Sequence, residues 1–350
     1  MRAGMQTRRT FIKSAGLGVV ASPTLLYATR KSGSVLPIVR AGEHTYEVIH
    51  DWGTLPANIR YGNTHGVCED AQGQIYVHHT VHATSERPDT MVVFDENGRF
   101  VRSWGGEFKG GAHGLHIVKE GSTEYLYLCD TQRGVVAKTT PTGEIVWQLG
   151  YPKETKVYTV GADGTPTLKY SPTNVAIAPN DDVYVADGYG SSYINQYDAN
   201  GRYIRTFGGP GKEAGQLSCP HGLIVDRRGP DPVLMVADRA NNRIQVLTLD
   251  GKHVRFVEGT TYPCHFSEYQ GMMVVPDLFA RVTLIDRQNQ VIGHLGDNGP
   301  ESWKTLRTGA RENFPAGKFV CPHSATFDRH GNIFVVEWVE VGRVTKLRKV

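Results

Sequence analysis

Short stretches that alternate apolar and polar residues recur along most of the chain, as in VYVAD (Val183–Asp187) and IFVVE (Ile333–Glu337). Period-two alternation predicts β-strands with one buried face, and the Gly, Asn, Asp and Pro clusters between them predict turns. The stretches repeat in one order: a strand that begins at His-Gly or an equivalent, a strand that ends in an acidic residue, a third strand, and a closing strand that ends in Gly. Each unit is therefore predicted to be a four-stranded antiparallel sheet.

This unit occurs six times. Successive copies begin 48, 61, 47, 44 and 58 residues apart, at His65, His113, Asn174, His221, His265 and His323. Such a period is close to the roughly 40 to 50 residues per blade of repeat proteins that form β-propellers, with insertions in the second and fifth copies. Turn formers stand before four of the closing strands, at residues 96–98, 141–143, 199–201 and 250–251. The predicted fold class is all-β, a six-bladed β-propeller.

The last copy has three strands, whereas a fourth-strand pattern stands before the first copy. Tyr46–Gly53 resembles the closing strands Phe100–Gly106 and Tyr203–Gly209. We expect this N-terminal strand to pair with the last blade and close the ring, which removes exposed sheet edges. The alternative is an extended N-terminal arm.

The first 33 residues differ from the rest because they carry six basic residues and no acidic one. The sequence TRRTFIK (Thr7–Lys13) followed by a weakly apolar run resembles a twin-arginine export signal, with cleavage expected after Ala28. A basic amphipathic helix is the alternative. We therefore expect a signal segment over 1–33 and a propeller domain over 41–350, exported through the twin-arginine translocon to the periplasm or the exterior.

Charge and cysteine content argue against several classes of protein. Lys and Arg number 38 against 35 Asp and Glu, and four of the basic residues precede Ala28, so the mature chain is close to neutral. We expect no nucleic-acid partner and, after cleavage, no stable membrane span, since no apolar stretch approaches the roughly 20 residues that a span needs. Five cysteines without a CxxC pair predict neither a zinc ribbon nor a complete disulfide framework.

The first positions of the six units form the most informative set. In a propeller the first strand of each blade lines the central channel, so these positions form a ring, and five of the six are histidines. Blades two, four and six are a third of a turn apart, so His113, His221 and His323 can converge on one metal ion. Three neutral imidazoles with an open position favour zinc, although iron or copper also accepts imidazoles. We expect His65 and His265 to lie on the ring outside this trio.

The stretch Ser171–Gly259, with VYVADGYGSSYINQYDANGRYIRTFG and CPHGLIVDRRGPDPVLMVADRANNRIQV, resembles the NHL-repeat propellers of the peptidyl-α-hydroxyglycine α-amidating lyase family, and weaker similarity covers all six blades. The resemblance implies that His113, His221 and His323 hold zinc, that Tyr189 is the catalytic tyrosine, and that Arg239 pairs with a substrate carboxylate. The implied reaction cleaves a carbinolamide N–C bond of a small or peptide-like substrate and releases an amide and an aldehyde.

This sequence departs from the family pattern at several positions. His79, within VHHTV, stands in place of a second family arginine, and Ser324 stands in place of an acidic residue that helps to hold a structural calcium, so calcium is doubtful. Cys321, Gly190 and Met235 also differ from the family residues. His78, His79 and His82 either replace the missing arginine at the rim or are solvated loop residues.

Other interpretations stay open. Tyr189 could be a strand-end aromatic residue, and Arg239 could form a salt bridge with Asp130, Asp187 or Asp238; Asp130 and Glu337, at equivalent strand ends, are expected to form hydrogen bonds between blades. The same channel metal could serve a hydrolase or an oxygenase, or the propeller could bind a partner without catalysis. A calcium-dependent lactonase would need oxygen ligands in the channel, and the ring supplies Asn174 alone.

Overall fold

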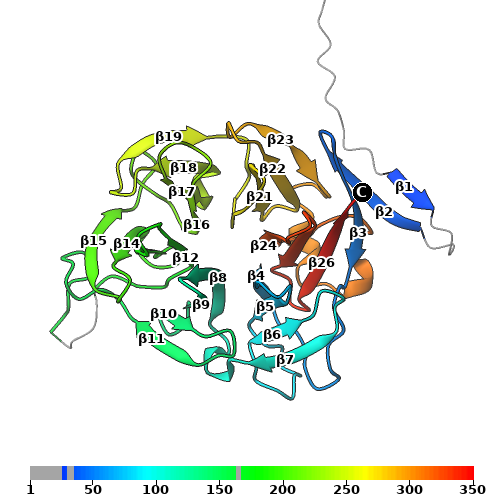
Figure 1. Ribbon diagram of the computed structural model, residues 1–350, viewed down its shortest axis with the longest axis horizontal. Coiled ribbons are helices and arrows are strands. Elements are labelled where there is room, and N and C mark those ends of the chain that lie inside the picture. Colours follow the sequence, from blue (N-terminus) through cyan, green and yellow to red (C-terminus); the bar gives the residue numbers. More distant parts are fainter. Residues whose placement is uncertain (1–25, 30–34, 163–166) are drawn as a thin grey trace, which may run out of the picture.

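The computed structural model describes residues 26–29, 35–162 and 167–350. Figure 1 shows their strands as six sheets in a ring, with the first strand of each sheet toward the axis. The fold is a six-bladed β-propeller, as the repeat predicts. The predicted export signal, residues 1–33, lies outside the described residues except for the short strand β1 (Leu26–Thr29).

Each of the first three blades has four consecutive antiparallel strands. Blade one contains β4 (Thr64–Glu69), β5 (Ile75–His79), β6 (Met91–Phe94) and β7 (Phe100–Trp104), followed by the 3-10 turn η1 (Gly106–Phe108). Blade two contains β8 (Ala112–Glu120), β9 (Thr123–Asp130), β10 (Val135–Thr139) and β11 (Ile145–Leu149). Blade three contains β12 (Asn174–Ile177), β13 (Val183–Ala186), β14 (Tyr193–Tyr197) and β15 (Tyr203–Gly208).

The next two blades repeat this order, and the sixth is assembled from both ends of the chain. Blade four contains β16 (Pro220–Asp226), β17 (Val233–Asp238), η2 (Arg239–Asn241), β18 (Arg243–Leu247) and β19 (His253–Val257). Blade five contains β20 (Ser267–Tyr269), β21 (Met272–Asp277), β22 (Arg281–Ile285) and β23 (Val291–Leu295). Blade six contains β24 (Pro322–Phe327), β25 (Ile333–Glu337), β26 (Arg343–Lys349), β3 (His44–His50), β2 (Val35–Ala41) and β1.

The N-terminal strand closes the ring. Strand β3 pairs antiparallel with β26, with His50 opposite Thr345 and Tyr46 opposite Lys349. The predicted closure is therefore confirmed. The structure adds β2 and β1 outside β3, so the sixth sheet has six strands and reaches further than the single closing strand predicted (Figure 1).

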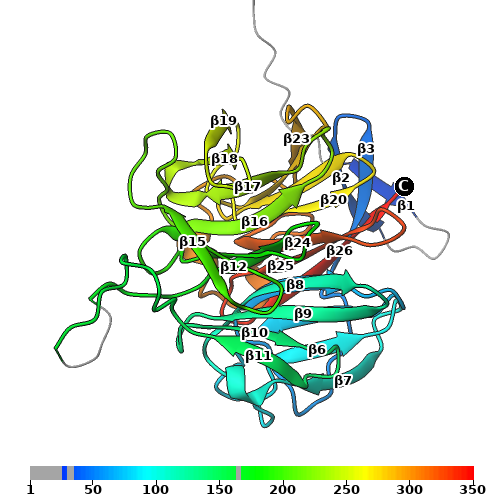
Figure 2. The same ribbon diagram turned by 60° about the vertical axis from the view of Figure 1, so that its left-hand side comes forward.

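Two long connections correspond to the expected insertions. The connection between β11 and β12 projects from the ring in Figure 2, and the connection between β23 and β24 contains α1 (Trp303–Leu306) and η3 (Arg311–Asn313). Within the described residues, no helix is long and apolar enough to cross a membrane.

The hydrophobic core consists of layers between neighbouring blades. Between blades one and two, for example, the buried side chains of Tyr76 and Met91 pack with those of Leu115, Leu126 and Leu128. The fourth strands turn one face to solvent instead, and the Val101 side chain on β7 is 43% exposed. Because the apolar layers lie between blades, the first strands are free to present polar side chains to the axis.

Substitution of Tyr46 tests whether β3 is an integral part of blade six. Tyr46 is fully buried in the apolar layer of that blade, and its hydroxyl has no partner among the described residues. We expect Tyr46→Ala to lower the free energy of unfolding by about 3–5 kcal/mol, as for other large aromatic truncations. Tyr46→Phe should be neutral or stabilising, because the hydroxyl it removes makes no bond to the protein.

Urea unfolding followed by tryptophan fluorescence measures both effects. Val101→Ala on the exposed face of β7 is the matched control and should change stability by less than about 0.5 kcal/mol. If Tyr46→Ala proves as stable as that control, β3 does not belong to the folded ring.

Candidate metal centre

Four histidines occupy irregular positions at the start of the inner strands. The pairing of the first and second strands shifts register between Ala112 and Leu115, between Pro220 and Leu223, between Pro322 and Ser324, and between Thr64 and Gly66. These shifts enclose His113, His221, His323 and His65. A β-bulge leaves a residue outside the regular ladder and re-aims its side chain. No such shift is found at Asn174 in β12, whose pairing with β13 is regular.

The three predicted ligands lie together at the axis. Their ring centroids are 4.9 Å apart for His113 and His221, 4.7 Å for His113 and His323, and 4.6 Å for His221 and His323. The three rings come from blades two, four and six, as the threefold argument expects.

Hydrogen bonds fix the tautomer of each of these rings. Nδ1 of His113 donates to the carbonyl of Thr173 at 2.8 Å, Nδ1 of His221 to that of Cys264 at 2.8 Å, and Nδ1 of His323 to that of His65 at 2.9 Å. A carbonyl can only accept, so each Nδ1 carries the proton and each neutral ring keeps its lone pair on Nε2. Metal-binding histidines commonly have their other nitrogen held in this way.

A fourth histidine joins the cluster, contrary to expectation. The His65 ring lies 4.7 Å from that of His113 and 4.5 Å from that of His323, and ring nitrogens of these three residues all lie within 4.8 Å of one another. By this distance His65, and not the predicted His221, completes a group with His113 and His323, because its strand carries the same bulge. Its Nδ1 lies 3.3 Å from Nε2 of His323 rather than from a carbonyl, and since that Nε2 carries no proton, Nδ1 of His65 is the donor and its lone pair also stays on Nε2. Two sets of three histidines therefore share His113 and His323 and differ in the third member, which is His221 in the predicted set and His65 in the set with the closest ring nitrogens.

His265 lies on the ring but outside the cluster, as expected. Its Nδ1 donates to the carbonyl of Ala325 at 3.3 Å, and its Nε2 is buried without a partner among the described residues.

Burial makes the cluster a set of neutral bases. It lowers the pKa of His113 to about 3 and holds the pKa values of His221 and His323 well below the usual range, with the charge of Arg239 acting in the same direction. Metal ions bind the deprotonated imidazole, so protons do not compete for Nε2 near neutral pH. The donor set thus fits a divalent cation with nitrogen ligands.

The two other predicted site residues adjoin the cluster. The hydroxyl oxygen of Tyr189, which follows β13, lies 3.2 Å from Nε2 of His113 and 3.1 Å from Nε2 of His221. Nη1 of Arg239 donates to this oxygen at 3.2 Å, and Nη2 donates to Sγ of Cys219 at 3.1 Å. Burial raises the pKa of Tyr189 to about 12, an increase that the charge of Arg239 opposes.

Arg239 is a buried cation without a carboxylate partner among the described residues. Its side chain is 9% exposed, and its Nε has no partner there. The acids that could have formed a salt bridge with it are used elsewhere: Asp130 pairs with Arg133 and Asp238 with Arg243. Asp187 accepts hydrogen bonds from Tyr158 and from the backbone N–H groups of Ser171 and Ser191. The salt-bridge interpretation of Arg239 is therefore wrong.

Of the two acids expected to join blades, Glu337 does so through its backbone, which exchanges hydrogen bonds with the Thr64 hydroxyl of blade one, whereas Asp130 bonds within its own blade. The carboxylates at the ends of the second strands act within blades. Asp238 accepts the backbone N–H of Ser218, three residues before His221, and Glu337 accepts those of Val320 and Cys321, just before His323. Each acid therefore anchors the segment that leads into the inner strand of its own blade. These anchors help to set the position of two of the three predicted ligands.

Two of the three remaining histidines are not the solvated loop residues that were considered. His78 and His79 are fully buried because β5 continues to His79. The His79 ring packs edge-on against Tyr61, and burial lowers its pKa to about 3, so it carries no positive charge at neutral pH. His82 is partly exposed, and its Nδ1 lies 2.8 Å from the hydroxyl of Thr84.

Comparison with known proteins agrees with this geometry at a coarse level. No protein-family model matches the chain. A Caenorhabditis elegans protein named "Probable peptidyl-alpha-hydroxyglycine alpha-amidating lyase" is 29% identical over 268 residues, which is 74% of this chain and 70% of that protein. Rat peptidylglycine alpha-amidating monooxygenase is 30% identical over 174 residues, or 47% of this chain, but the match spans 16% of the rat protein. Human NHL repeat-containing protein 3 is 25% identical over 166 residues, 46% of this chain and 45% of that protein.

Solved structures show the fold alone. A streptogramin B lyase superposes with a TM-score of 0.58 at 13% identity, covering 89% of this chain and all of that one. A Xanthomonas campestris gluconolactonase gives a TM-score of 0.56 at 13% identity and covers 96% and 99%. The chain is therefore an NHL-repeat six-bladed propeller with distant homologues named as amidating lyases.

Metal content tests the ligand assignment. We expect about one transition-metal ion per chain in the purified protein and loss of most of it in His221→Ala, because removing one of three ligands leaves an incomplete site. His265→Ala, from the same ring, is the matched control and should keep the metal. Elemental analysis by mass spectrometry gives both values.

The same measurement on His65→Ala separates the two possible sets of three histidines. Retention of the metal in His65→Ala supports His113, His221 and His323. Loss in His65→Ala with retention in His221→Ala would show that His65 replaces His221 as a ligand.

Proposed function

We propose that this protein is a metal-dependent lyase that cleaves the N–C bond of a carbinolamide and releases an amide and an aldehyde. One observation carries the proposal: three imidazoles of the same tautomer converge, and the Tyr189 hydroxyl lies within hydrogen-bonding distance of two of their Nε2 atoms. The distant homologues named as amidating lyases point to the same reaction class.

The metal would be held by Nε2 of His113, His221 and His323. Zinc is our preferred ion, because three neutral imidazoles with an open position are typical of catalytic zinc; iron and copper remain chemically acceptable to the same ligands. When bound, such an ion supplies Lewis-acid polarisation of a substrate oxygen. We propose no calcium site, since Ser324 offers a hydroxyl where a carboxylate would be needed.

Tyr189 is the proposed general base. Its hydroxyl oxygen is partly buried and lies beside Nε2 of His113 and of His221, where we propose that the substrate hydroxyl binds. The phenolate takes the proton of that hydroxyl, the carbon–oxygen double bond forms, and the N–C bond breaks with its electron pair on nitrogen. The amide nitrogen needs one proton, which Tyr189 can return, so the phenolate is restored.

Arg239 makes this role possible for a phenol. Burial alone raises the pKa of Tyr189, whereas a general base must lose its phenolic proton near neutral pH. The guanidinium donates a hydrogen bond to the phenolic oxygen and has no carboxylate partner among the described residues, so it stabilises the phenolate over the phenol. We therefore propose that the first task of Arg239 is to activate Tyr189, with any contact to a substrate carboxylate made through its remaining N–H groups.

We propose that the chain is exported through the twin-arginine translocon and works in the periplasm or outside the cell. The support is the sequence TRRTFIK and the basic character of the first 33 residues. Export of an already folded protein would allow the metal to be inserted before translocation.

Tyr189→Phe tests the mechanism. The substitution keeps the ring and removes the hydroxyl, so we expect the rate constant for carbinolamide cleavage to fall by about two orders of magnitude or more. The metal content should not change, because Tyr189 is not one of the three ligands. Release of aldehyde is followed for peptidyl-α-hydroxyglycine and for uncharged carbinolamides, since the substrate's carboxylate is not established by the fold.

Two results would contradict the lyase proposal. One is metal-loaded wild-type protein that cleaves none of these compounds, which would favour a hydrolase, an oxygenase or a binding protein on the same scaffold. The other is full activity of Tyr189→Phe on a compound that the wild type cleaves.

A further inference from the structure

A second cavity lies at the end of the inner strands that is remote from the histidine cluster. It has a volume of about 400 Å³, and the residues that line it come from blades two, three, four and five. They include His116 and Val118 of β8, Ile177 of β12 and Ile224 of β16. Blades two and five are opposite each other in a ring of six, so this cavity extends across the axis at the other mouth of the channel (Figure 1).

The cavity is separated from the proposed metal centre by most of the length of an inner strand. On β16, His221 belongs to the cluster, whereas Asp226, five residues later, lines the cavity. A strand rises about 3.3 Å per residue, so the separation is roughly 15 Å. A small molecule bound in the cavity therefore makes no contact with the cluster.

Two arginines at this mouth have guanidinium groups that no protein group engages. Arg227 lies in the turn between β16 and β17, and Arg287 lies in the turn between β22 and β23. Both are exposed, and neither side chain has a hydrogen bond or an ion pair within the part of the chain that the structure describes. Nε of Arg287 lies 3.2 Å from the point that a Cβ on Gly271 would occupy, so this side chain lies over the turn between β20 and β21. We call Arg227 and Arg287 the mouth arginines.

The neighbouring arginine shows how a structural cation is held at the same place. Arg228 donates two hydrogen bonds to the carboxylate of Asp226, at 2.9 and 3.0 Å. It also donates to the carbonyl of Asp286 at 2.8 Å and to the side chain of Asn289, both on blade five. Arg228 thus neutralises Asp226 and joins blades four and five, and this leaves Arg227 without a comparable structural task.

The other titratable groups of the wall leave an excess of positive charge. The carboxylate of Glu268 accepts the N–H of Gly271 at 2.5 Å and forms no ion pair with the described arginines. Burial, together with the charge of Arg227, lowers the pKa of His116 to about 4, so this imidazole is neutral at pH 7. With Asp226 and Arg228 paired, two free cations stand against one carboxylate.

Apolar side chains line the cavity on the inner side of these charges. Ile224 precedes Asp226 and Arg227 on the chain and is therefore closer to the cluster, and Val118 and Ile177 line the cavity beside it. A volume of about 400 Å³ is in the range of small-molecule sites, which combine apolar walls with a few polar groups. The cavity thus offers an apolar interior and a positively charged mouth.

We propose that this cavity binds a small organic carboxylate. Its apolar body packs on Val118, Ile177 and Ile224, and its carboxylate accepts hydrogen bonds from the mouth arginines, whose planar guanidinium groups match a carboxylate. The site is distinct from the metal centre and does not depend on the proposed reaction.

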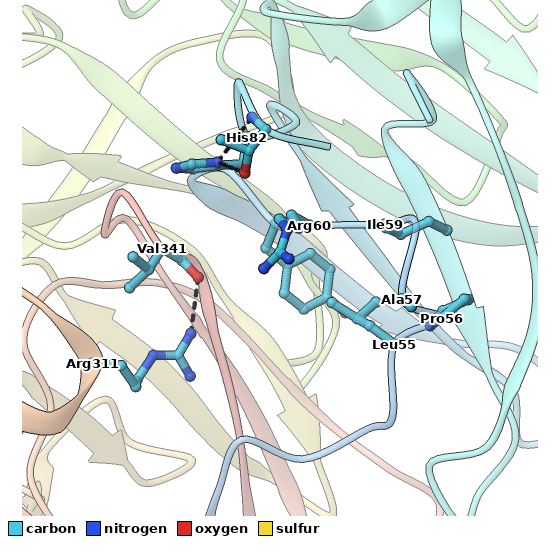
Figure 3. A pocket seen from close by; sticks show the side chains of 10 residues that line it. Leu55, Pro56, Ala57, Ile59, Arg60, His82, Arg311 and Val341 are labelled. Carbon is cyan, nitrogen blue, oxygen red and sulfur yellow. Dashed lines mark hydrogen bonds between the residues drawn. The ribbon is translucent and has the colours of Figure 1, made fainter. Parts of the chain in front are cut away.

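A cavity elsewhere on the molecule supplies a matched control. It has a volume of about 460 Å³, and Arg60 and Arg311 are among the residues that line it (Figure 3). Arg311 pairs with Asp51 and donates to the carbonyl of Val341 at 2.8 Å, so it holds two segments of the chain together. The side chain of Arg60 is exposed and makes no such contact with a described residue. Arg60 is therefore an unpaired arginine of a different cavity.

Binding of 2-naphthoate to the metal-loaded full chain, measured by calorimetry, tests the proposal. The compound has a flat apolar body and one carboxylate, whereas 2-naphthamide has the same body and no charge. We expect Arg227→Gln and Arg287→Gln each to weaken 2-naphthoate binding by roughly 3- to 10-fold, as for an exposed charge-assisted hydrogen bond, and the double variant to weaken it by more than about 10-fold. The affinity for 2-naphthamide should stay within about twofold in all three variants.

Two further variants separate this site from the others. Arg60→Gln should leave 2-naphthoate binding unchanged, because Arg60 lines the other cavity. His221→Ala, which alters the metal centre, should also bind 2-naphthoate as the wild type does. The proposal is overturned if the wild type does not bind 2-naphthoate or binds the amide equally well, or if the double variant binds 2-naphthoate as tightly as the wild type. It is also overturned if Arg60→Gln or His221→Ala weakens binding as much as the double variant.

Discussion

The geometry of the site depends on one type of contact. The histidines of blades two, four and six each donate a hydrogen bond to a carbonyl of the next blade. For His113 and His221 the bond is 2.8 Å long, and the residue after each histidine is glycine. A Cβ on Gly114 would lie 2.4 Å from the Thr173 carbonyl oxygen, and one on Gly222 would lie 2.5 Å from that of Cys264. These are the same carbonyls that accept the imidazole protons. Because the same carbonyl lies against the glycine and accepts the imidazole proton, the close approach of two blades also fixes the direction in which Nε2 points.

The repeat, the six blades, the closing strand and the ring of histidines could be predicted because each follows from a period in the sequence. The bulges could not, since they depend on how the first strand of a blade meets the second in three dimensions. A local signal did exist: Gly or Ser follows His65, His113, His221 and His323, whereas Val follows Asn174 and Phe follows His265. The prediction from symmetry used only alternate blades, and it therefore placed His65 outside the cluster.

The surroundings of some polar residues near the site were predicted wrongly, because the sequence gave no measure of their burial. His78 and His79 lie in a polar-looking stretch, yet β5 continues through them, and their position between blades removes them from solvent. Asp130 and Glu337 were expected to join blades; Glu337 does so through its backbone, but both carboxylates bond to N–H groups of their own blade, which short connections bring within reach. In both cases burial and hydrogen bonding depend on where the chain runs at the end of a strand. The alternation of apolar residues does not specify that path.

The charges at the site restrict its possible ligands more than the fold does. The propeller is shared at 13% identity with a streptogramin B lyase and a gluconolactonase, so the scaffold leaves the chemistry open. Burial keeps the histidines uncharged, whereas Arg239 is 9% exposed and lacks a carboxylate among the described residues. A buried cation without a counterion is costly, and the cost is relieved by a phenolate at Tyr189 or by an anionic ligand. A site of this composition therefore lowers the cost of deprotonating Tyr189, whose oxygen Arg239 already contacts.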